Sequence, residues 1–360
     1  MKSSYLESDV TLLLKDISGQ VTPLPTKERE KLIQSGVHYC EMLPLEYKPT
    51  EKYMEAYQFA LKSYAKTTAQ AVCQVSEKVY SSIGDEFTTK EDDNNEIVIV
   101  SLARAGIPIG ILMKRYLEKK YQKKVFHYSI SIIRDRGIDE NAIEYILKNH
   151  DPKTVRFVDG WIGKGAIQRE LKSALEKYPM LNPTLAVLSD PANITELCGT
   201  HEDILIPSSC LNSTVSGLIS RTFLRDDIIS PTDFHGAVFY SELKDEDLSY
   251  EFIDAIEKHF DYNTTLADTT PSGFTGLSEV KEIAKHYDID NINFIKPGIG
   301  EATRVLIRRV PWKLLVRPNS QDNPLLAHLL QLAKEKNVPV EEYDLKNYIA
   351  CGIIKNMADV

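Results

Sequence analysis

The sequence is poor in cysteine and contains no long apolar run. Its five cysteines are odd in number and far apart, and none forms a C-x-x-C pair, so the sequence indicates neither a disulfide framework nor a zinc site. No window approaches the roughly 18 consecutive apolar residues of a membrane span, and the first residues lack the apolar region of a signal peptide. We therefore expect a cytoplasmic protein with reduced thiols.

The sequence also lacks an overall excess of basic residues. The formal net charge is −9, which argues against non-specific nucleic-acid binding by the whole chain. From Pro271 onward, however, 12 Lys and Arg stand against 11 Asp and Glu, whereas the preceding part carries 31 against 41. The C-terminal part therefore has nearly balanced charges, whereas the rest of the chain is acidic.

A polar segment rich in Thr, Asp and Ser divides the chain. With 360 residues the chain is long enough for two domains. We predict a first domain over residues 1–262, a linker over 263–273 and a second domain over 274–360.

The first domain alternates short β-rich runs with helical patterns. This order predicts an α/β fold, with a parallel, doubly wound sheet (sheet core about 97–220) whose binding residues lie at the carboxyl ends of its strands. A loop-rich arm over residues 1–50 and a long helix over 50–81 precede it. The predicted strands cover 97–101, 125–132, 155–158, 185–188 and 204–206, and the predicted helices cover 108–118, 139–148, 166–178 and 249–260.

The stretch from Val155 to Leu171 carries the strongest chemical signal. A buried strand is followed by Asp159, and a Gly163-Lys164-Gly165 turn opens a helix at Ala166. Glycines let backbone N–H groups approach a ligand, and a helix N-terminus favours an anion, so the stretch predicts a phosphate site. The spacing excludes a P-loop, because Gly160 stands too close to Gly163-Lys164 and the hydroxyl residue is missing.

Two other strand ends carry arginines beside small residues. The turn Arg104-Ala105-Gly106 follows the first strand and has the charge and backbone donors for a diphosphate. Arg134 and Arg136 precede Gly137 after the second strand, where they form either a phosphate-clamping loop or a charged cap on the next helix.

These turns resemble the loops of type I phosphoribosyltransferases that hold phosphoribosyl diphosphate (PRPP). The resemblance implies a PRPP site with Mg²⁺, in which Arg104, Arg134 and Arg136 act in catalysis. Gly160 replaces the second acid of the family's pair, and this departure favours a non-catalytic nucleotide- or RNA-binding sensor as an alternative. The residues that the resemblance assigns to PRPP are Arg104, Ala105, Gly106, Asp159, Gly160, Gly163, Lys164, Gly165 and Ala166.

Several longer sequence segments resemble those of one bacterial protein family. They include H-Y-C-E-M-L-P, S-L-A-R-A-G-I-P-I-G and I-P-S-S-C-L-N-S-T-V-S-G-L. The family is phosphoribosyltransferase-like, is also labelled "cysteine protease StiP", and is associated with tellurite- and stress-resistance gene clusters. The resemblance covers residues from about 20 to 260.

The expected reaction is transfer of a phosphoribosyl group to an unidentified base or nucleophile. Polar residues of two loops are candidates for the acceptor side: His38, Tyr39, Cys210, Asn212, Ser213 and Thr214. Packing is the favoured explanation for His38 and Tyr39, and it explains each residue of the second loop equally well. The StiP label also suggests a cysteine hydrolase, with Cys210 as nucleophile and His235 or His201 as base.

The second domain contains a basic helix start after a predicted glycine turn. The segment from Gly298 to Arg309 resembles the start of the RNA-binding helix in Pelota-type domains, with Gly300 where that family has an asparagine. The resemblance implies RNA contacts, while a protein-interaction module remains the alternative. The implied RNA-binding residues are Gly298, Gly300, Glu301, Arg304, Arg308 and Arg309.

Overall fold

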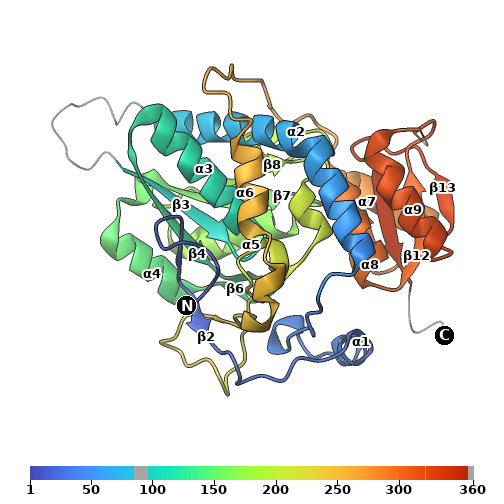
Figure 1. The fold of residues 1–360 in the computed structure, drawn as a ribbon, viewed down its shortest axis with the longest axis horizontal. Coiled ribbons are helices and arrows are strands. Elements are labelled where there is room, and N and C mark those ends of the chain that lie inside the picture. The colour runs from blue at the N-terminus through green and yellow to red at the C-terminus, as the bar shows by residue number, and fades with distance from the viewer. Residues whose placement is uncertain (85–95, 321, 356–360) are drawn as a thin grey trace.

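A six-stranded parallel sheet forms the centre of the first domain (Figure 1). The computed structural model describes residues 1–84, 96–320 and 322–355. The strand order is β1-β4-β3-β7-β8-β9. The strands are β1 (Thr11–Leu12), β4 (Lys124–Ile130), β3 (Glu96–Leu102), β7 (Val155–Trp161), β8 (Leu185–Ser189) and β9 (Cys198–Thr200).

Helices cover both faces of this sheet. Alternate residues of β3 point to opposite faces, and Ile97 and Ile99 join one hydrophobic core whereas Val98 and Val100 join another. The helices α2 (Glu51–Ile83), α3 (Gly106–Tyr121) and α6 (Ser249–Glu257) cover the first face, and α4 (Glu140–Asn149) and α5 (Ala166–Ala174) cover the second. Burial on both faces explains why these strands read as continuous apolar runs.

The predicted mixed α/β architecture with a parallel central sheet is confirmed, but the fifth predicted strand is wrong. Residues 204–206 are not a strand, and β9 takes the edge position instead. The apolar side chains of Leu205 and Ile206 are buried in the core, which satisfies their hydrophobicity without strand pairing. Pro207 follows them and begins a short 3-10 turn, η5 (Pro207–Cys210).

The N-terminal arm packs along the first domain. Its strand β1 extends the sheet beside β4, and β2 (Lys15–Asp16) pairs with β10 (Gly236–Ala237). The helix α1 (Thr26–Gln34) and the turn η1 (Tyr39–Glu41) follow. The loop-rich arm expected from the prolines is therefore held by backbone pairing at two places.

The smaller C-terminal domain has its own four-stranded sheet, ordered β11-β14-β12-β13. Its strands are β11 (Ile295–Pro297), β14 (Ala350–Ile354), β12 (Pro311–Val316) and β13 (Val340–Glu342), and its helices are α7 (Gly276–His286), α8 (Ile299–Arg308) and α9 (Ala327–Glu335). Only the β12–β13 pair is parallel.

The two domains share a hydrophobic core. Ile299 and Leu306 of α8 belong to the same buried cluster as residues of α2 and η5. Polar contacts reinforce this junction, since Tyr53 Oη donates to Ile307 O at 3.2 Å. Figure 1 shows the second domain beside the N-terminal end of α2.

Among the residues that the structure describes, no helix is long and apolar enough to cross a bilayer.

Candidate functional site

The strands β3, β4 and β7 end at the same edge of the sheet, so the predicted site residues come together there. Arg104 lies in the turn after β3, Arg134 follows β4 and Asp159 lies within the last part of β7. Parallel pairing of β3 with both neighbours places these three segments side by side.

Arg104 is tied to loops rather than open to a ligand. Its guanidinium donates to Ile219 O and Asn212 Oδ1, both at 2.8 Å, and pairs with Glu46 Oε1 at 3.2 Å. The charge of Arg104 is thus already matched by a carboxylate that is itself buried.

A cavity beside Arg104 is bounded by both domains. Arg104, Trp161 and Asn212 line it from the first domain, and Arg304 lines it from the second. The guanidinium of Arg304 lies over the Trp161 ring, 5.1 Å from its centroid.

Packing explains the glycine at position 106. A Cβ atom added to Gly106 would stand 2.6 Å from Val158 O, so a larger residue would push α3 away from β7. The predicted Arg104-Ala105-Gly106 turn is therefore also required for helix–sheet packing.

The Gly163-Lys164-Gly165 turn meets the second domain. Gly165 has φ +79° and stands at the N-cap of α5, as expected for a glycine at such a turn. Lys164 Nζ donates to Ile292 O at 2.5 Å and to Ile295 O at 3.1 Å, and Tyr348 Oη donates to Gly163 O at 2.6 Å. Burial, followed by the charge of Lys296, lowers the pKa of Lys164 to about 7. The turn predicted to bind phosphate thus docks the second domain, and Ala166 begins the helix behind it.

Asp159 is a half-buried residue whose carboxyl group lies beside the same junction. Its Oδ1 accepts a hydrogen bond from the Gly160 backbone N–H at 2.7 Å. Burial raises its pKa to about 6, and the nearby Arg304 only partly opposes this effect.

The arginine segment after β4 is a small hairpin. Strand β5 (Ile132–Ile133) pairs with β6 (Gly137–Ile138), and Glu170 of α5 accepts hydrogen bonds from the backbone N–H groups of Asp135 and Gly137. Arg136 pairs with Glu41 of η1 at 2.9 Å. The hairpin therefore connects the sheet edge to the N-terminal arm.

His38 and Cys40 form a close pair at this edge. His38 Nδ1 lies 2.9 Å from Cys40 Sγ, and His38 Nε2 lies 3.1 Å from the carbonyl oxygen of Arg134. That carbonyl can only accept, so Nε2 carries the hydrogen and the lone pair of Nδ1 faces the thiol. The Cys40 backbone N–H also donates to Nδ1, at 3.3 Å. A base held by a third group beside a thiol is the arrangement of a cysteine nucleophile.

Burial and the neighbouring guanidinium groups have opposite effects on the pKa of the Cys40 thiol. Burial raises the pKa of the Cys40 thiol, and the guanidinium groups of Arg136 and Arg221 lower it less strongly. Burial, and then the charge of Arg136, lowers the pKa of His38. The imidazole is therefore unprotonated near pH 7 and can accept a proton.

Sequence reasoning selected His38 and Tyr39 but not Cys40 beside them. The available signal was the H-x-C spacing ahead of Glu41, because a side chain that caps a helical turn accepts a hydrogen bond from the backbone N–H two residues on, as His38 does from Cys40.

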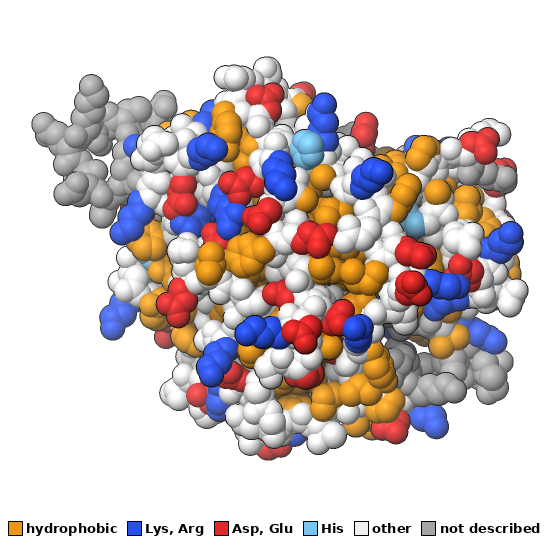
Figure 2. All heavy atoms as spheres, viewed as in Figure 1, with side chains coloured by type: hydrophobic (Ala, Val, Ile, Leu, Met, Phe, Trp, Pro, Cys, Tyr) orange, Lys and Arg blue, Asp and Glu red, His pale blue; other side chains and the backbone are white. Residues whose placement is uncertain are grey.

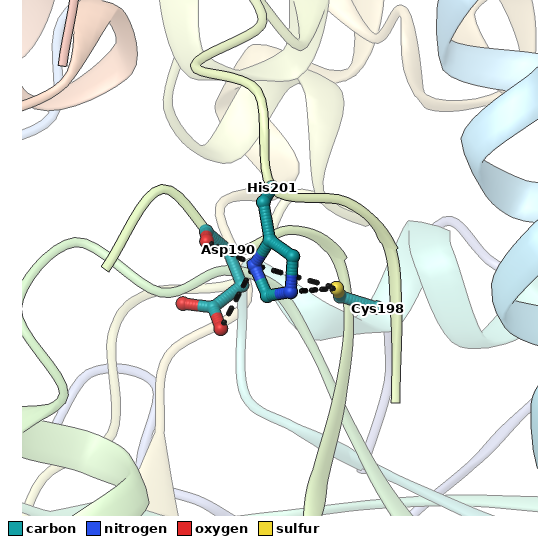
Figure 3. Close-up of side chains that lie close together, drawn as sticks. All are labelled: Asp190, Cys198 and His201. Atoms are coloured by element: carbon teal, nitrogen blue, oxygen red, sulfur yellow. Dashed lines mark hydrogen bonds and ion pairs between the residues drawn. The ribbon is translucent and has the colours of Figure 1, made fainter. Parts of the chain in front are cut away.

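A second cysteine–histidine pair lies at the β8–β9 edge (Figure 3). His201 Nδ1 and Nε2 lie 3.9 and 3.8 Å from Cys198 Sγ, and His201 Nδ1 lies 3.5 Å from Asp190 Oδ2. Both ring nitrogens also face backbone carbonyls: Nδ1 is 2.8 Å from Asp190 O and Nε2 is 3.0 Å from Thr269 O. Burial, together with the charge of Asp190, raises the pKa of the Cys198 thiol to about 12. Asp190, His201 and Cys198 have the residue types of a catalytic triad, but the imidazole is not oriented toward the thiol as a general base would be.

The imidazoles proposed for Cys210 are engaged elsewhere. His201 lies against Cys198, and His235 Nδ1 is 2.8 Å from Ser131 Oγ, with its backbone N–H donating to Asp139 Oδ2 at 2.6 Å. Cys210 itself is buried in the core that also contains Tyr57.

The remaining acceptor-side candidates hold loops together. Asn212 binds Arg104, and Ser213 Oγ donates to Glu46 Oε2 at 3.4 Å. The backbone carbonyl of Thr214 accepts a hydrogen bond from Leu248 N.

The start of α8 faces the first domain. The Ile299 N–H donates to Asp203 Oδ1 at 2.9 Å, and Gly298 packs beside the same carboxyl group. Burial raises the pKa of Asp203 to about 6. Gly300 packs near Ser209 and Trp161. A first-domain carboxylate therefore occupies the helix end that the sequence assigned to RNA.

The charged residues farther along α8 are partly engaged. Glu301 and Arg304 pair with each other at 3.2 Å. Arg309 ends the helix and is half-buried, and the side chain of Arg308 lies outside the described part of the structure.

Comparisons with known proteins agree on one family. Residues 3–257 match the model described as "Tellurite-like stress resistance cysteine protease StiP", and residues 274–356 match the PELOTA RNA binding domain. The chain is 38% identical over 351 residues to the cysteine protease StiP of Acinetobacter baylyi, and this match covers 92% of the chain and 88% of that protein.

These matches correct the enzyme class expected from the sequence. Their names describe a cysteine protease, so PRPP-dependent phosphoribosyl transfer, and with it a phosphoribosyltransferase or glycosyltransferase, is wrong for this chain. The physical reason for the error is that glycine turns at strand ends serve domain docking as well as phosphate binding. The cysteine hydrolase alternative agrees better with the matches.

The resemblance to the StiP family over the first domain and the resemblance of the second domain to a Pelota-type module are confirmed. With a family match over more than two thirds of its length, the chain belongs to the tellurite-like stress resistance cysteine protease StiP family.

Proposed function

We propose that this chain is a cysteine hydrolase in which Cys40 is the nucleophile and His38 is the general base. One observation carries the proposal: His38 Nδ1 lies 2.9 Å from Cys40 Sγ while the Arg134 carbonyl holds His38 Nε2. The name of the Acinetobacter baylyi relative supports a peptide bond as the substrate.

The reaction follows from this orientation. The Cys40 thiol gives its proton to His38 Nδ1, and the sulfur attacks the carbonyl carbon of the peptide bond. His38 then returns the proton to the leaving amine as the C–N bond breaks, which leaves a thioester on Cys40. Water attacks the thioester with His38 again as base, and the products are a carboxylic acid and the restored thiol.

Arg221 is the best-placed cation for the developing negative charge. It lies under Tyr39, with its guanidinium 5.3 Å from the ring centroid, and donates to the carbonyls of Tyr39 and Met42. Its Nε is buried and has no hydrogen-bond partner in the described part of the structure. A spare buried donor near the nucleophile supports a role in stabilising a tetrahedral oxyanion.

Substrate access requires a local movement. The Cys40 side chain is only 1% exposed, and its Sγ lies 3.6 Å from Leu224 O. The Leu224 N–H also donates to Cys40 O at 3.0 Å. The segment around Leu224 must therefore move away before a peptide reaches the thiol.

Three matched variants test this proposal on unfolded casein. Cys40→Ala should lower the hydrolysis rate by more than about 10³-fold, because the nucleophile is lost. Cys210→Ala removes the nucleophile suggested by the sequence and should retain the parent rate, as should Cys351→Ala. Loss of activity in Cys210→Ala with retention in Cys40→Ala would overturn the assignment.

The Pelota match supports RNA as a partner of the second domain. Because Asp203 and Trp161 cover the start of α8, the C-terminal end of that helix is the better candidate for phosphate contacts in the full chain. On the face drawn in Figure 2, basic and acidic side chains are interleaved, which disfavours that face as a continuous phosphate track.

RNA binding is tested with the full chain and a fluorescent RNA hairpin at low salt. The double change Arg308→Ala and Arg309→Ala should weaken binding and flatten its salt dependence, since each phosphate contact contributes about 0.7–0.9 to the slope. Lys281→Ala with Lys285→Ala removes the same charge from α7 and should have a smaller effect. No binding by the parent, or equal losses in the two double variants, would contradict this role.

A further inference from the structure

The Asp190–Cys198–His201 cluster contains more electron-rich atoms than the hydrogens of a neutral imidazole can satisfy. The strands β8 and β9 are neighbours, so the loop after β8 returns His201 and Cys198 to the position of Asp190. Figure 3 shows the imidazole between the carboxyl group of Asp190 and the thiol of Cys198. Cys198 and Asp190 are both fully buried.

The two ring nitrogens of His201 both face carbonyl oxygens. Nε2 lies 3.0 Å from Thr269 O, and Nδ1 lies 2.8 Å from Asp190 O. A neutral imidazole carries one N–H, so one of these nitrogens would direct a lone pair at an oxygen lone pair. A metal ion bound at one of the two nitrogens would relieve that repulsion.

The distances favour a metal ion at Nδ1. Zn–S and Zn–N bonds of about 2.3 and 2.0 Å place the ligand atoms of a tetrahedral site about 3.5 Å apart. His201 Nδ1 lies 3.5 Å from Asp190 Oδ2 and 3.9 Å from Cys198 Sγ, and the three donor atoms all lie within 4.8 Å of one another.

The surroundings of the cluster agree with a metal site. Metal-bound histidines usually donate their other N–H to a carbonyl or carboxylate, which is the role of Thr269 O here. Asp190 Oδ2 accepts hydrogen bonds from the backbone N–H groups of Ile194 and Thr195 at 2.7 and 2.8 Å. Oδ1 is buried and has no hydrogen-bond partner among the described residues, so Oδ1 is the oxygen with spare capacity to ligate.

We propose that Cys198 Sγ, His201 Nδ1 and the carboxylate of Asp190 form a structural site for a zinc-type divalent cation. The ligands are of the types that Zn²⁺ prefers, and Cys198 and His201 are separated by two residues, a short spacing typical of zinc sites. The Asp190 carbonyl oxygen is the nearest further donor. Binding replaces the thiol proton, which is released to solvent.

The proposed ion would hold an edge of the first domain together. It would connect the edge strand β9 to the end of β8, and through His201 it would act on Thr269 in the segment between the domains. This role is separate from hydrolysis at Cys40.

Cobalt titration of the chelator-treated full chain tests the site. Under reducing, anaerobic conditions Co²⁺ should bind with one equivalent per chain, and a thiolate-to-cobalt charge-transfer band should appear together with intense visible bands typical of tetrahedral cobalt. Cys198→Ser should lose the charge-transfer band, whereas Cys351→Ser, which removes an equally buried thiol, should retain it.

Two outcomes would contradict the metal site. No charge-transfer band in the parent, or a band that survives Cys198→Ser, would overturn the proposal. If Cys198→Ser fails to fold, the X-ray absorption spectrum of the zinc-loaded parent decides: one sulfur with nitrogen and oxygen neighbours is expected, and a shell without sulfur contradicts the site.

Discussion

The two cysteine–histidine pairs use the same residue types in opposite ways. In the pair at the sheet's carboxyl edge, one nitrogen of His38 is held by a carbonyl and the other faces the Cys40 thiol. In the pair at the β8–β9 edge, both nitrogens of His201 face carbonyls and the Cys198 sulfur lies beside both nitrogens at nearly equal distances. The comparison teaches that the direction of the imidazole lone pair, rather than proximity to sulfur, separates a base from a ligand.

The electrostatic surroundings of the pairs also differ. Arg136 and Arg221 lower the pKa of the Cys40 thiol against the effect of burial. Around Cys198, the charge of Asp190 adds to burial and raises the pKa further, and Lys78 opposes this less strongly. The strongest charge effect thus favours a thiolate at Cys40 and opposes one at Cys198, which makes the first pair better suited to nucleophilic attack.

The largest expected effect comes from removing the base. His38→Gln should lower the hydrolysis rate by about 10²–10⁴-fold, because an amide cannot accept the thiol proton. His259→Gln, at an exposed position, should retain the parent rate. If His201→Gln abolishes hydrolysis while His38→Gln retains it, the roles assigned to the two histidines are wrong.

The strand β9, which contains Cys198, should be sensitive to changes in its packing against α2. A Cβ atom at Gly199 would lie 2.5 Å from Ala71 O of α2, so Gly199→Ala must separate β9 from the helix. We expect a loss of about 1–3 kcal/mol in the free energy of unfolding, measured by urea denaturation. Gly273→Ala has no neighbour within 4 Å of the added atom and serves as the control; equal stability of the two variants would contradict the packing argument.

The smallest effect concerns the pH dependence of hydrolysis. Burial and Arg136 hold the pKa of His38 below its usual value, and kcat/KM falls when His38 becomes protonated. Removing the positive charge in Arg136→Ala should let that pKa rise, so the acid limb of the kcat/KM profile should move to higher pH. Lys62→Ala removes a distant exposed charge and should leave the limb unchanged; a downward shift in Arg136→Ala would contradict the assignment of the limb to His38.

The sequence predicted much of the scaffold because buried parallel strands and their crossover helices have strong periodic patterns. The helix at 51–83 and four of the strands appear close to the predicted positions. Strand β9 was missed because it is short and contains Gly199, whereas the more apolar run at 204–206 is buried without pairing.

The candidate site was harder to predict, because its contacts join segments far apart in the chain. His38 was selected from its loop, but its partner Arg134 is 96 residues away, and no local pattern reveals that the Arg134 carbonyl fixes the histidine. The glycine turn at 163–165 resembled a phosphate site, and only the tertiary structure places the second domain against it.

The rate at which iodoacetamide modifies each thiol of the native chain tests the central claim most directly. Samples are quenched at intervals and mapped by mass spectrometry, with the urea-unfolded chain as the reference in which all five cysteines react. The account predicts that Cys40 is alkylated first and that His38→Gln slows this reaction, because the imidazole generates the thiolate. Earlier alkylation of Cys198 or Cys210, or an unchanged Cys40 rate in His38→Gln, would contradict it.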